Sequence, residues 1–281
     1  MRTPRIIREN EDFLIVYKPA GMASETARVT EMDLETWLLN YRRKKNQQAE
    51  IHLIERLDQP VEGLLLAAKT KKAAAELSDL QRKGFLEKTY QALVSLSFQS
   101  EKTAGTVEQA TGSDGMSGAA EGTAGSDGRV GAGEAAGSDG MAGTTEKAAE
   151  THGMAGLSEE GDKLAPEGRF TDFLKKNPKS RMAETTESSD PAARKAVLDY
   201  KVLENRSNQG YPICLIEIHL VTGRFHQIRA QFSSRGWPIV GDRRYGGRPA
   251  RRLNLSSVRL SFPWKGENVS AEIEPDFCEK I

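Results

Sequence analysis

Cysteine is nearly absent from this sequence, since only Cys214 and Cys278 occur among 281 residues. Two cysteines cannot build a disulfide framework and are typical of a protein in the reducing cytoplasm. No stretch reaches the roughly 18 uninterrupted apolar residues of a membrane-spanning helix. The first residues, MRTPRIIRENEDF, contain no apolar core of a secretory signal. These absences exclude a disulfide scaffold and a membrane protein, and we expect a cytoplasmic protein.

Apolar side chains are also scarce, at 37% of the sequence with a mean hydropathy of -0.56. Much of this shortage comes from residues 101–167, where Gly, Ala, Ser, Thr and Glu dominate and the pentapeptides GSDGM and GSDGR recur. A segment without apolar periodicity cannot bury enough surface to offset the entropy lost on ordering. We therefore predict that residues 101–167 are a low-complexity acidic disordered insertion. Residues 1–100 and 168–281 are expected to form a single discontinuous domain.

A net charge is missing as well, because 40 basic residues balance 40 acidic ones. Residues 101–167 contain 13 acidic and 4 basic side chains, which leaves 36 basic and 27 acidic side chains in the remainder. The predicted folded part therefore carries a net charge of +9. Such a charge suits a polyanion such as RNA, although basic domains without this role are common.

The remainder of the chain mixes strand-like and helix-like patterns without a regular strand–helix–strand alternation. The near-continuous apolar run at 63–69 is typical of a central strand, and Thr70 is a good N-cap for a helix that ends at Gly84. Residues 196–204 and 213–221 are expected to be adjacent antiparallel strands. Residues 12–21 are expected to form a strand that ends in a Pro-Ala-Gly turn, and further strands are expected at 88–96 and in the late segments SSVRLSF and SAEIE. Further helices are expected near 34–41, where Thr30 and Asp33 offer a start signal, and at 226–236. The pattern predicts an α+β fold.

Asp58 lies in an Asp-Gln-Pro turn directly before the apolar strand at 63–69. A turn fixed to a buried strand is a rigid mounting for a nucleophile or a base. Composition alone favours a simple turn-forming aspartate. By itself, Arg56 is better interpreted as a surface side chain.

A second stretch, VTGRFHQIRAQFSSRGWPIVGDRRYGG, places polar side chains at the start of an expected helix. From this helix Arg229 can pair with a carboxylate across the core, and a buried aspartate needs such a partner to stay ionised. His226 is better interpreted as a hydrogen-bonded structural histidine, since no second ligand at metal spacing accompanies it. Tyr90 is either a plain strand aromatic or a ring that stacks on a base.

Together these motifs resemble the RluA-type RNA pseudouridine synthases. The resemblance rests on DFLIVYKPAGM, RLD before a Gly-Leu-Leu-Leu strand, EKTYQALV, TGRFHQIR, PIVGDRRYGG and LNLSSVRLSFPW, which occur in this order on both sides of the expected insertion. It covers roughly residues 5–98 and 168–275. The resemblance implies the pseudouridine synthase fold, a mixed and mainly antiparallel sheet with flanking helices.

The resemblance also implies an activity and a set of site residues. Such enzymes detach uracil from C1′ of a uridine in RNA, rotate the base and rejoin it through C5, with no metal and no cofactor. The implied partner is ribosomal or transfer RNA, and we expect a monomer. The implied catalytic residues are Asp58, Tyr90 and Arg229, and the candidate RNA-binding residues are Arg56, which is associated with holding the RNA open, and Arg224, His226 and Gln227.

The sequence departs from the family pattern at three places. Glu55 stands where a histidine usually precedes Arg-Leu-Asp, Val61-Glu62 replaces Thr-Ser, and Phe225 replaces a small hydroxyl residue. These departures motivate one alternative, a catalytically weakened RNA-binding or ribosome-assembly protein on the same scaffold. A carboxylate-pair hydrolase that uses Asp58 with Glu55 or Glu62 is a second alternative. The hydrolase leaves the order of the motifs unexplained.

Overall fold

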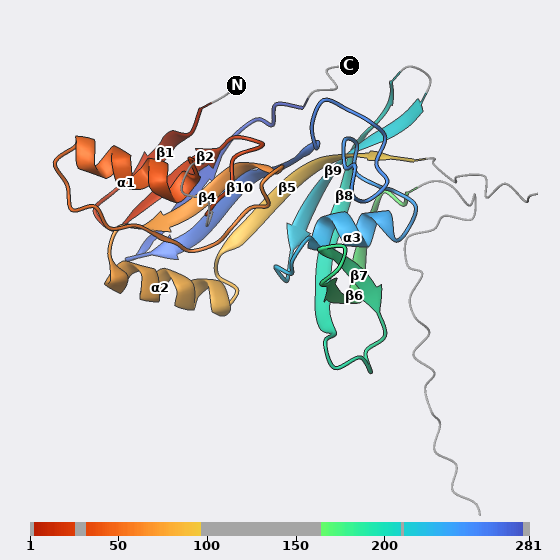
Figure 1. Cartoon of the computed structure of the whole chain (residues 1–281), viewed down its shortest axis with the longest axis horizontal. Helices are drawn as coiled ribbons and strands as arrows, with labels where there is room; N and C mark the ends of the chain where they lie inside the picture. The colour runs from red at the N-terminus through yellow and green to blue at the C-terminus, as the bar shows by residue number, and fades with distance from the viewer. Residues whose placement is uncertain (1–2, 26–31, 97–163, 209–210, 278–281) are drawn as a thin grey trace, which may run out of the picture. The chain divides into compact units, whose positions relative to one another are not determined.

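Eleven strands of the described residues join into one sheet, in the order β1-β2-β4-β10-β5-β9-β8-β6-β7, with β3 paired to β4 and β11 to β10. The computed structural model describes residues 3–25, 32–96, 164–208 and 211–277 (Figure 1). The strands are β1 Arg5–Glu9, β2 Phe13–Lys18, β3 His52–Leu53, β4 Glu62–Ala68, β5 Glu87–Ser95, β6 Glu167–Asn177, β7 Met182–Thr186, β8 Arg194–Asn208, β9 Tyr211–Leu220, β10 Leu255–Trp264 and β11 Glu267–Glu272.

Most strand pairs are antiparallel, and the exception among the described strands is the parallel pair of β4 and β10. The expected antiparallel neighbours β8 and β9 pair along most of their length. The α+β class and the mixed, mainly antiparallel sheet are therefore confirmed.

Strand β4 is the apolar run that follows Asp58, and all seven of its residues are buried. It pairs with β2 on one side and with β10 on the other, and β2 is buried along its whole length. A strand that is covered on both faces carries apolar side chains without alternation. This burial explains why the sequence pattern predicted a central strand here.

Two apolar cores lie on opposite faces of this part of the sheet, because successive side chains of a strand point to opposite faces. Leu14 of β2 belongs to one core together with Leu38, whereas its neighbour Phe13 belongs to the other together with Leu77. Leu38 comes from helix α1 (Leu34–Lys44) and Leu77 from helix α2 (Lys71–Arg82). The two helices thus cover different faces of the sheet near β2 and β4.

The caps of these helices follow the sequence signals. The side chain of Asp33 accepts a hydrogen bond from Thr36 N at 2.8 Å, and that of Thr70 accepts one from Ala73 N at 3.2 Å. Thr30, the other expected start signal of α1, lies outside the described residues. Helix α3 (Gln227–Ser233) contacts β6 and β7 (Figure 1) and is shorter than the expected 226–236.

The expected insertion needs one correction at its C-terminal boundary. Leu164 is buried in a core cluster, Val202 N donates to Pro166 O at 2.7 Å, and Glu167 begins β6. Residues 164–167 therefore belong to the fold rather than to the insertion. The expectation of disorder concerns residues 101–163, which lie outside the described residues.

Candidate active site

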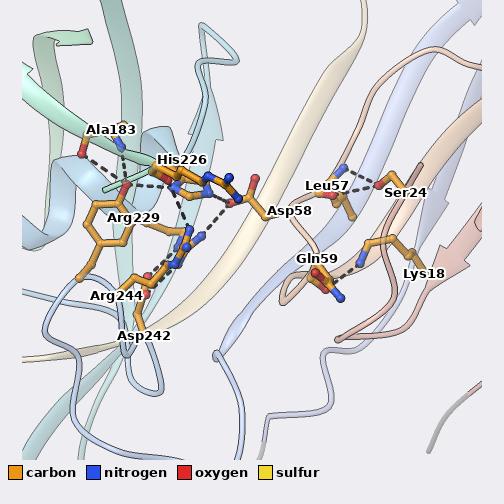
Figure 2. Close-up of polar contacts among 12 residues, drawn as sticks. Lys18, Ser24, Leu57, Asp58, Gln59, Ala183, His226, Arg229, Asp242 and Arg244 are labelled. Atoms are coloured by element: carbon orange, nitrogen blue, oxygen red, sulfur yellow. Dashed lines mark hydrogen bonds and ion pairs between the residues drawn. The ribbon is translucent and has the colours of Figure 1, made fainter. Parts of the chain in front are cut away.

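The turn that carries Asp58 is tied to the Lys-Pro-Ala-Gly turn that follows β2. Gly21 N donates to Gln59 O at 2.8 Å, and Val61 N closes the Asp58 turn with a 3.0 Å hydrogen bond to Asp58 O. Ser24 Oγ donates to Leu57 O at 2.9 Å and accepts from Leu57 N at 3.1 Å (Figure 2). These backbone contacts on both sides of Asp58 make its mounting rigid.

Lys18 lies beneath the same turn and is fully buried. Its ammonium donates to three backbone carbonyls, Met22 O at 2.7 Å, Pro19 O at 3.2 Å and Gln59 O at 3.3 Å. Burial lowers the pKa of Lys18 to about 7, against the opposing charges of Asp58 and Glu62. Lys18 thus joins the two turns, and with this pKa it carries only part of a positive charge near pH 7.

Arg229 of α3 links Asp58 to a second carboxylate. Its Nη1 donates to Asp58 Oδ2 at 3.0 Å. Its Nε and Nη2 donate to Asp242 Oδ2 and Oδ1 at 2.7 and 2.8 Å (Figure 2). The side chains of Arg229 and Asp242 are 4% and 1% exposed, and that of Asp58 is 25% exposed. Burial alone would lower the pKa of Arg229. The negative charges and hydrogen bonds of Asp242, and then of Asp58, have the larger effect and raise that pKa. The contact expected between Arg229 and Asp58 is present, and Asp242 is an additional partner.

His226 is the second side chain in contact with Asp58, with Nε2 3.4 Å from Oδ2. It caps α3 in a left-handed backbone conformation, with φ 52°. Its Nδ1 lies 3.0 Å from the hydroxyl of Tyr245, which accepts a hydrogen bond from Ala183 N at 2.7 Å. Burial lowers the pKa of His226 to about 4, so the ring is neutral near pH 7. A neutral imidazole with its proton on Nε2, which faces Asp58, accepts at Nδ1. The Tyr245 hydroxyl can donate there, or to its other acceptor, Ala183 O at 3.3 Å.

Tyr90 of β5 is 5% exposed and lines the same cleft as Asp58. Burial raises the pKa of its hydroxyl, so Tyr90 is protonated near pH 7. Two residues before it on β5, Lys88 forms a buried ion pair with Glu55. Burial alone would lower the pKa of Lys88, but the charge of Glu55 raises it. Glu55 is therefore neutralised by a partner.

Glu62, the other carboxylate that departs from the family pattern, is also engaged within the fold. Its Oε2 accepts hydrogen bonds from Tyr17 and Arg252, each at 2.8 Å, and its Oε1 accepts one from Asp276 N at 2.9 Å. Its side chain is 2% exposed. Glu62 thus fixes the C-terminal segment to β4.

All seven site residues expected from the sequence line one cleft of about 870 Å³: Arg56, Asp58, Tyr90, Arg224, His226, Gln227 and Arg229. They come from the turn before β4, from β5 and from the start of α3, and they lie together only in the folded chain. The cleft is large enough for a nucleotide, because ligand pockets span about 300–1,000 Å³.

The candidate RNA contacts differ in how free their polar groups are. The side chain of Arg56 is 71% exposed and lies 3.3 Å from Glu25. Arg224 is exposed, with Nε donating to Lys195 O at 2.9 Å. The amide of buried Gln227 bonds to Thr222 Oγ1, Arg224 N and Val197 O. Gln227 therefore organises the turn before α3.

Asp242 and Tyr245 are site residues that the sequence reasoning did not single out. Both lie in GDRRYGG, one of the motifs that carry the family resemblance. A signal for Asp242 was available, because a buried Arg offers five donors and one carboxylate cannot satisfy them. Nothing in the sequence indicated the contact between Tyr245 and His226.

Among the described residues, no group of three or more His, Cys, Asp or Glu side chains is arranged to hold a metal ion. In the same part of the chain, no helix is long and apolar enough to cross a membrane.

Comparisons with known proteins identify the family of the chain. Residues 12–234 match the family described as RNA pseudouridylate synthase. The chain is 22% identical over 286 residues to the ribosomal large subunit pseudouridine synthase C of Rickettsia bellii, an alignment that covers 99% of this chain and 71% of that protein. It is 24% identical over 272 residues to an uncharacterized RNA pseudouridine synthase of Bacillus subtilis, covering 95% and 67% of the two chains.

The fold is similar to a solved human structure, RNA Pseudouridylate Synthase Domain Containing 1. The TM-score is 0.63 at 19% identity, and the match covers 98% of this chain and 84% of the human one. At this identity the likeness supports the fold alone. The family match spans most of the sequence and includes Asp58, Tyr90 and Arg229. The chain therefore belongs to the RNA pseudouridylate synthase family and is an RNA pseudouridine synthase, an isomerase that acts on RNA.

Proposed function

We propose that Asp58 is the catalytic carboxylate of this synthase and that the cleft receives a uridine extruded from its RNA. The observation that carries the proposal is the way in which Asp58 is held. Its Oδ2 contacts Arg229 and His226, while no hydrogen bond from the described residues occupies Oδ1. A carboxylate that is fixed through one oxygen and open at the other suits attack on a substrate or removal of a proton.

The reaction requires no co-reactant. The C1′–N1 bond breaks, a C1′–C5 bond forms, the proton on C5 leaves to solvent and N1 gains a proton, so the product is an isomer of the substrate. Asp58 can attack C1′, add to the base or take a proton from the sugar, and each route uses the same carboxylate. Tyr90 presents its ring and a protonated hydroxyl to the flipped uracil.

The other residues of the cleft take supporting roles. Arg56 is exposed at the cleft and is suited to hold the RNA open after the base leaves the stack. Arg224 adds positive charge for phosphates. His226 positions Asp58. For Gln227 we favour a role in shaping the turn over direct contact with RNA, because its amide bonds within the fold.

The substrate that we propose is ribosomal RNA, with transfer RNA as the alternative. The name of the Rickettsia bellii relative supports ribosomal RNA, since that protein is named for the large ribosomal subunit. We further propose that the protein acts in the cytoplasm as a monomer. The buried free thiol of Cys214 fits a reducing compartment.

The two alternatives are less well supported. Glu55 is ion-paired with Lys88 and Glu62 is bonded to Tyr17 and Arg252, so neither is a free second carboxylate for a hydrolase. A decayed, non-catalytic scaffold would not need to keep Asp58, Tyr90 and Arg229 around one cleft.

The decisive test is the Asp58→Asn variant. Asparagine keeps the shape of the side chain and loses the charge, so pseudouridine formation should vanish while RNA affinity and melting temperature stay close to those of the wild type. Release of tritium from RNA labelled at uridine C5 measures turnover. Substantial tritium release by the variant would contradict the assignment of Asp58, and an inactive wild-type protein would favour the non-catalytic alternative.

A further inference from the structure

An exposed aromatic ring lies at the rim of the cleft. Phe225 lines the cleft and is 43% exposed. A single exposed apolar side chain is common and needs no explanation. The contacts of Phe225 make this ring different.

Phe225 is stacked on His226, with ring centroids 3.8 Å apart and planes 19° from parallel. The same imidazole contacts Asp58 Oδ2 through Nε2. The ring of Phe225 is therefore separated from the catalytic carboxylate by a single side chain. Because His226 is buried and bonded to Tyr245, the stack gives Phe225 a fixed orientation beside the place where the target uridine reacts.

Lys176 of β6 is the second neighbour of the Phe225 ring. Its ammonium lies 4.9 Å from the ring centroid, and its side chain also lines the cleft. Lys176 is exposed, and no carboxylate of the described residues pairs with it. A cation–π contact at an exposed site is weaker than the stacking of a nucleobase on an aromatic ring. A base can therefore displace the ammonium from the ring, which leaves Lys176 close to the phosphates of the same strand.

We propose that Phe225 and Lys176 form a nucleotide platform for single-stranded RNA next to the target uridine. Phe225 stacks on the neighbouring base, and Lys176 contacts a phosphate. Every base offers a flat face, so the platform supplies affinity and position rather than sequence readout. The inference rests on the proposed active site, because it takes Asp58 as the point where the target uridine reacts.

The test uses the full chain and a single-stranded hexaribonucleotide that carries 2-aminopurine beside a central uridine. Stacking on Phe225 quenches 2-aminopurine fluorescence. The wild type and Phe225→Tyr, which keeps the ring, should quench it. Phe225→Leu keeps apolar bulk without the ring, so it should lose most of the quenching and bind about tenfold more weakly, or about 1.4 kcal/mol. Wild-type quenching and affinity in Phe225→Leu would overturn the proposal.

Lys176→Ala provides the second arm. It should keep the quenching, because the ring remains, and reduce the slope of log affinity against log salt by about 1. An unchanged slope would remove the phosphate contact from the proposal.

The Asp58→Asn variant separates this inference from the proposed active site. If Asp58→Asn is inactive and Phe225→Leu still quenches, the platform alone is wrong. If Asp58→Asn turns over RNA while Phe225→Leu loses its quenching, Phe225 still stacks on a base, but the assignment of Asp58 is wrong and the place of the platform beside the reacting uridine is overturned with it. In steady-state turnover, Phe225→Leu should raise KM by a larger factor than it lowers kcat, because stacking of a neighbouring base is the same in ground and transition states.

Discussion

At the scale of single residues, Arg229 holds two carboxylates that differ in their exposure to water. Asp242 is almost fully buried and accepts hydrogen bonds from Arg229 at both oxygens. Asp58 is a quarter exposed and accepts one from Arg229 at a single oxygen. Arg229→Ala leaves Asp242 buried without a partner, so we expect a loss of about 3–5 kcal/mol in the free energy of unfolding. Activity should also disappear, because Asp58 loses its main contact. Urea unfolding and tritium release measure the two effects.

Arg56→Ala is the matched control for this prediction. Arg56 also pairs with a carboxylate, but its side chain is 71% exposed, and an exposed pair contributes about 0–1 kcal/mol. We expect nearly unchanged stability and weaker RNA binding. Equal unfolding midpoints for Arg229→Ala and the wild type would show that the buried pair does not stabilise the fold.

His226 should make stability depend on pH below neutrality. Its pKa falls from 6.5 to about 4 in the fold, chiefly through burial, among the charges of Asp58, Arg229, Arg244 and Asp242. Between pH 6.5 and 4 the unfolded chain therefore binds a proton at His226 that the folded chain does not bind. Neutral His226 contributes fully to the free energy of unfolding above pH 6.5. This stability is lost as the pH falls, by about 2 kcal/mol at pH 5.

The comparison variant is His226→Asn, because asparagine tolerates the left-handed backbone at this position and does not titrate. Between pH 7 and pH 5 the wild type should lose about 2 kcal/mol more stability than His226→Asn. Parallel pH curves for the two proteins would mean that His226 keeps an ordinary pKa in the fold.

Individual residues also show how far the sequence could predict the site. Asp58 and Arg229 could be paired in advance, because a carboxylate before a buried strand needs a cation and motif order supplied one. The five donors of a buried Arg229 indicated a second acceptor, but the sequence could not identify it as Asp242, since the contact depends on how the loop after α3 folds back. Nor could the sequence reveal that Lys88 and Arg252 neutralise Glu55 and Glu62. Charge at a site depends on partners distant in sequence.

At the scale of elements, the parallel pair of β4 and β10 depends on a close approach at Gly63. This glycine has φ 128°, and a Cβ there would lie 2.3 Å from the backbone oxygen of Ser257. Gly63→Ala should therefore separate the two strands or distort β4 directly after the Asp58 turn. We expect a loss of more than about 3 kcal/mol, beyond the usual range for a point substitution, and low activity in the folded fraction.

Gly84→Ala is the control for Gly63→Ala. Gly84 also has a positive φ, 80°, but nothing lies within 4 Å of the position of its Cβ. Gly84→Ala should therefore lower the free energy of unfolding only through the strain of a left-handed backbone, by about 1–2 kcal/mol. Similar melting temperatures for the two variants would show that the contact with Ser257 can relax.

Elements differ in how well the sequence indicated them. Helix α2 was predictable because Thr70 caps it and its apolar positions follow a helical period. The sequence pattern did not indicate strands β6 and β7. Only three of their side chains are buried, those of Phe170, Leu174 and Ala183, and the others are polar or half-exposed. Strand β6 pairs with β8, and β7 pairs with β6. Local sequence pattern does not reveal these pairings.

At the scale of the whole molecule, charge is divided between two parts of the sequence. Residues 101–163 contain 12 acidic and 4 basic side chains, a net charge of -8, which leaves +8 on the remaining residues. A tethered acidic segment competes with RNA phosphates for a basic surface, and salt weakens this competition. Replacing residues 101–163 by a short Gly-Ser linker should raise RNA affinity modestly, most at low salt. Equal affinity at low salt would mean that the segment does not reach the RNA-binding surface.

The control for this deletion is a variant of full length in which neutral side chains replace the acidic ones of residues 101–163. It separates the effect of the segment's charge on RNA affinity from the effect of its bulk.

The boundary of that deletion decides its effect on stability. The cost of closing a loop grows slowly with its length, so removing residues 101–163 should leave the melting temperature nearly unchanged. A deletion that continues through residue 167 also removes buried Leu164 and the hydrogen bond from Val202 N to Pro166 O. Loss of a buried leucine costs about 2–5 kcal/mol, so this longer deletion should melt several degrees lower. A large fall in melting temperature for the shorter deletion would show that residues 101–163 contribute to the folded core, against the composition of that segment.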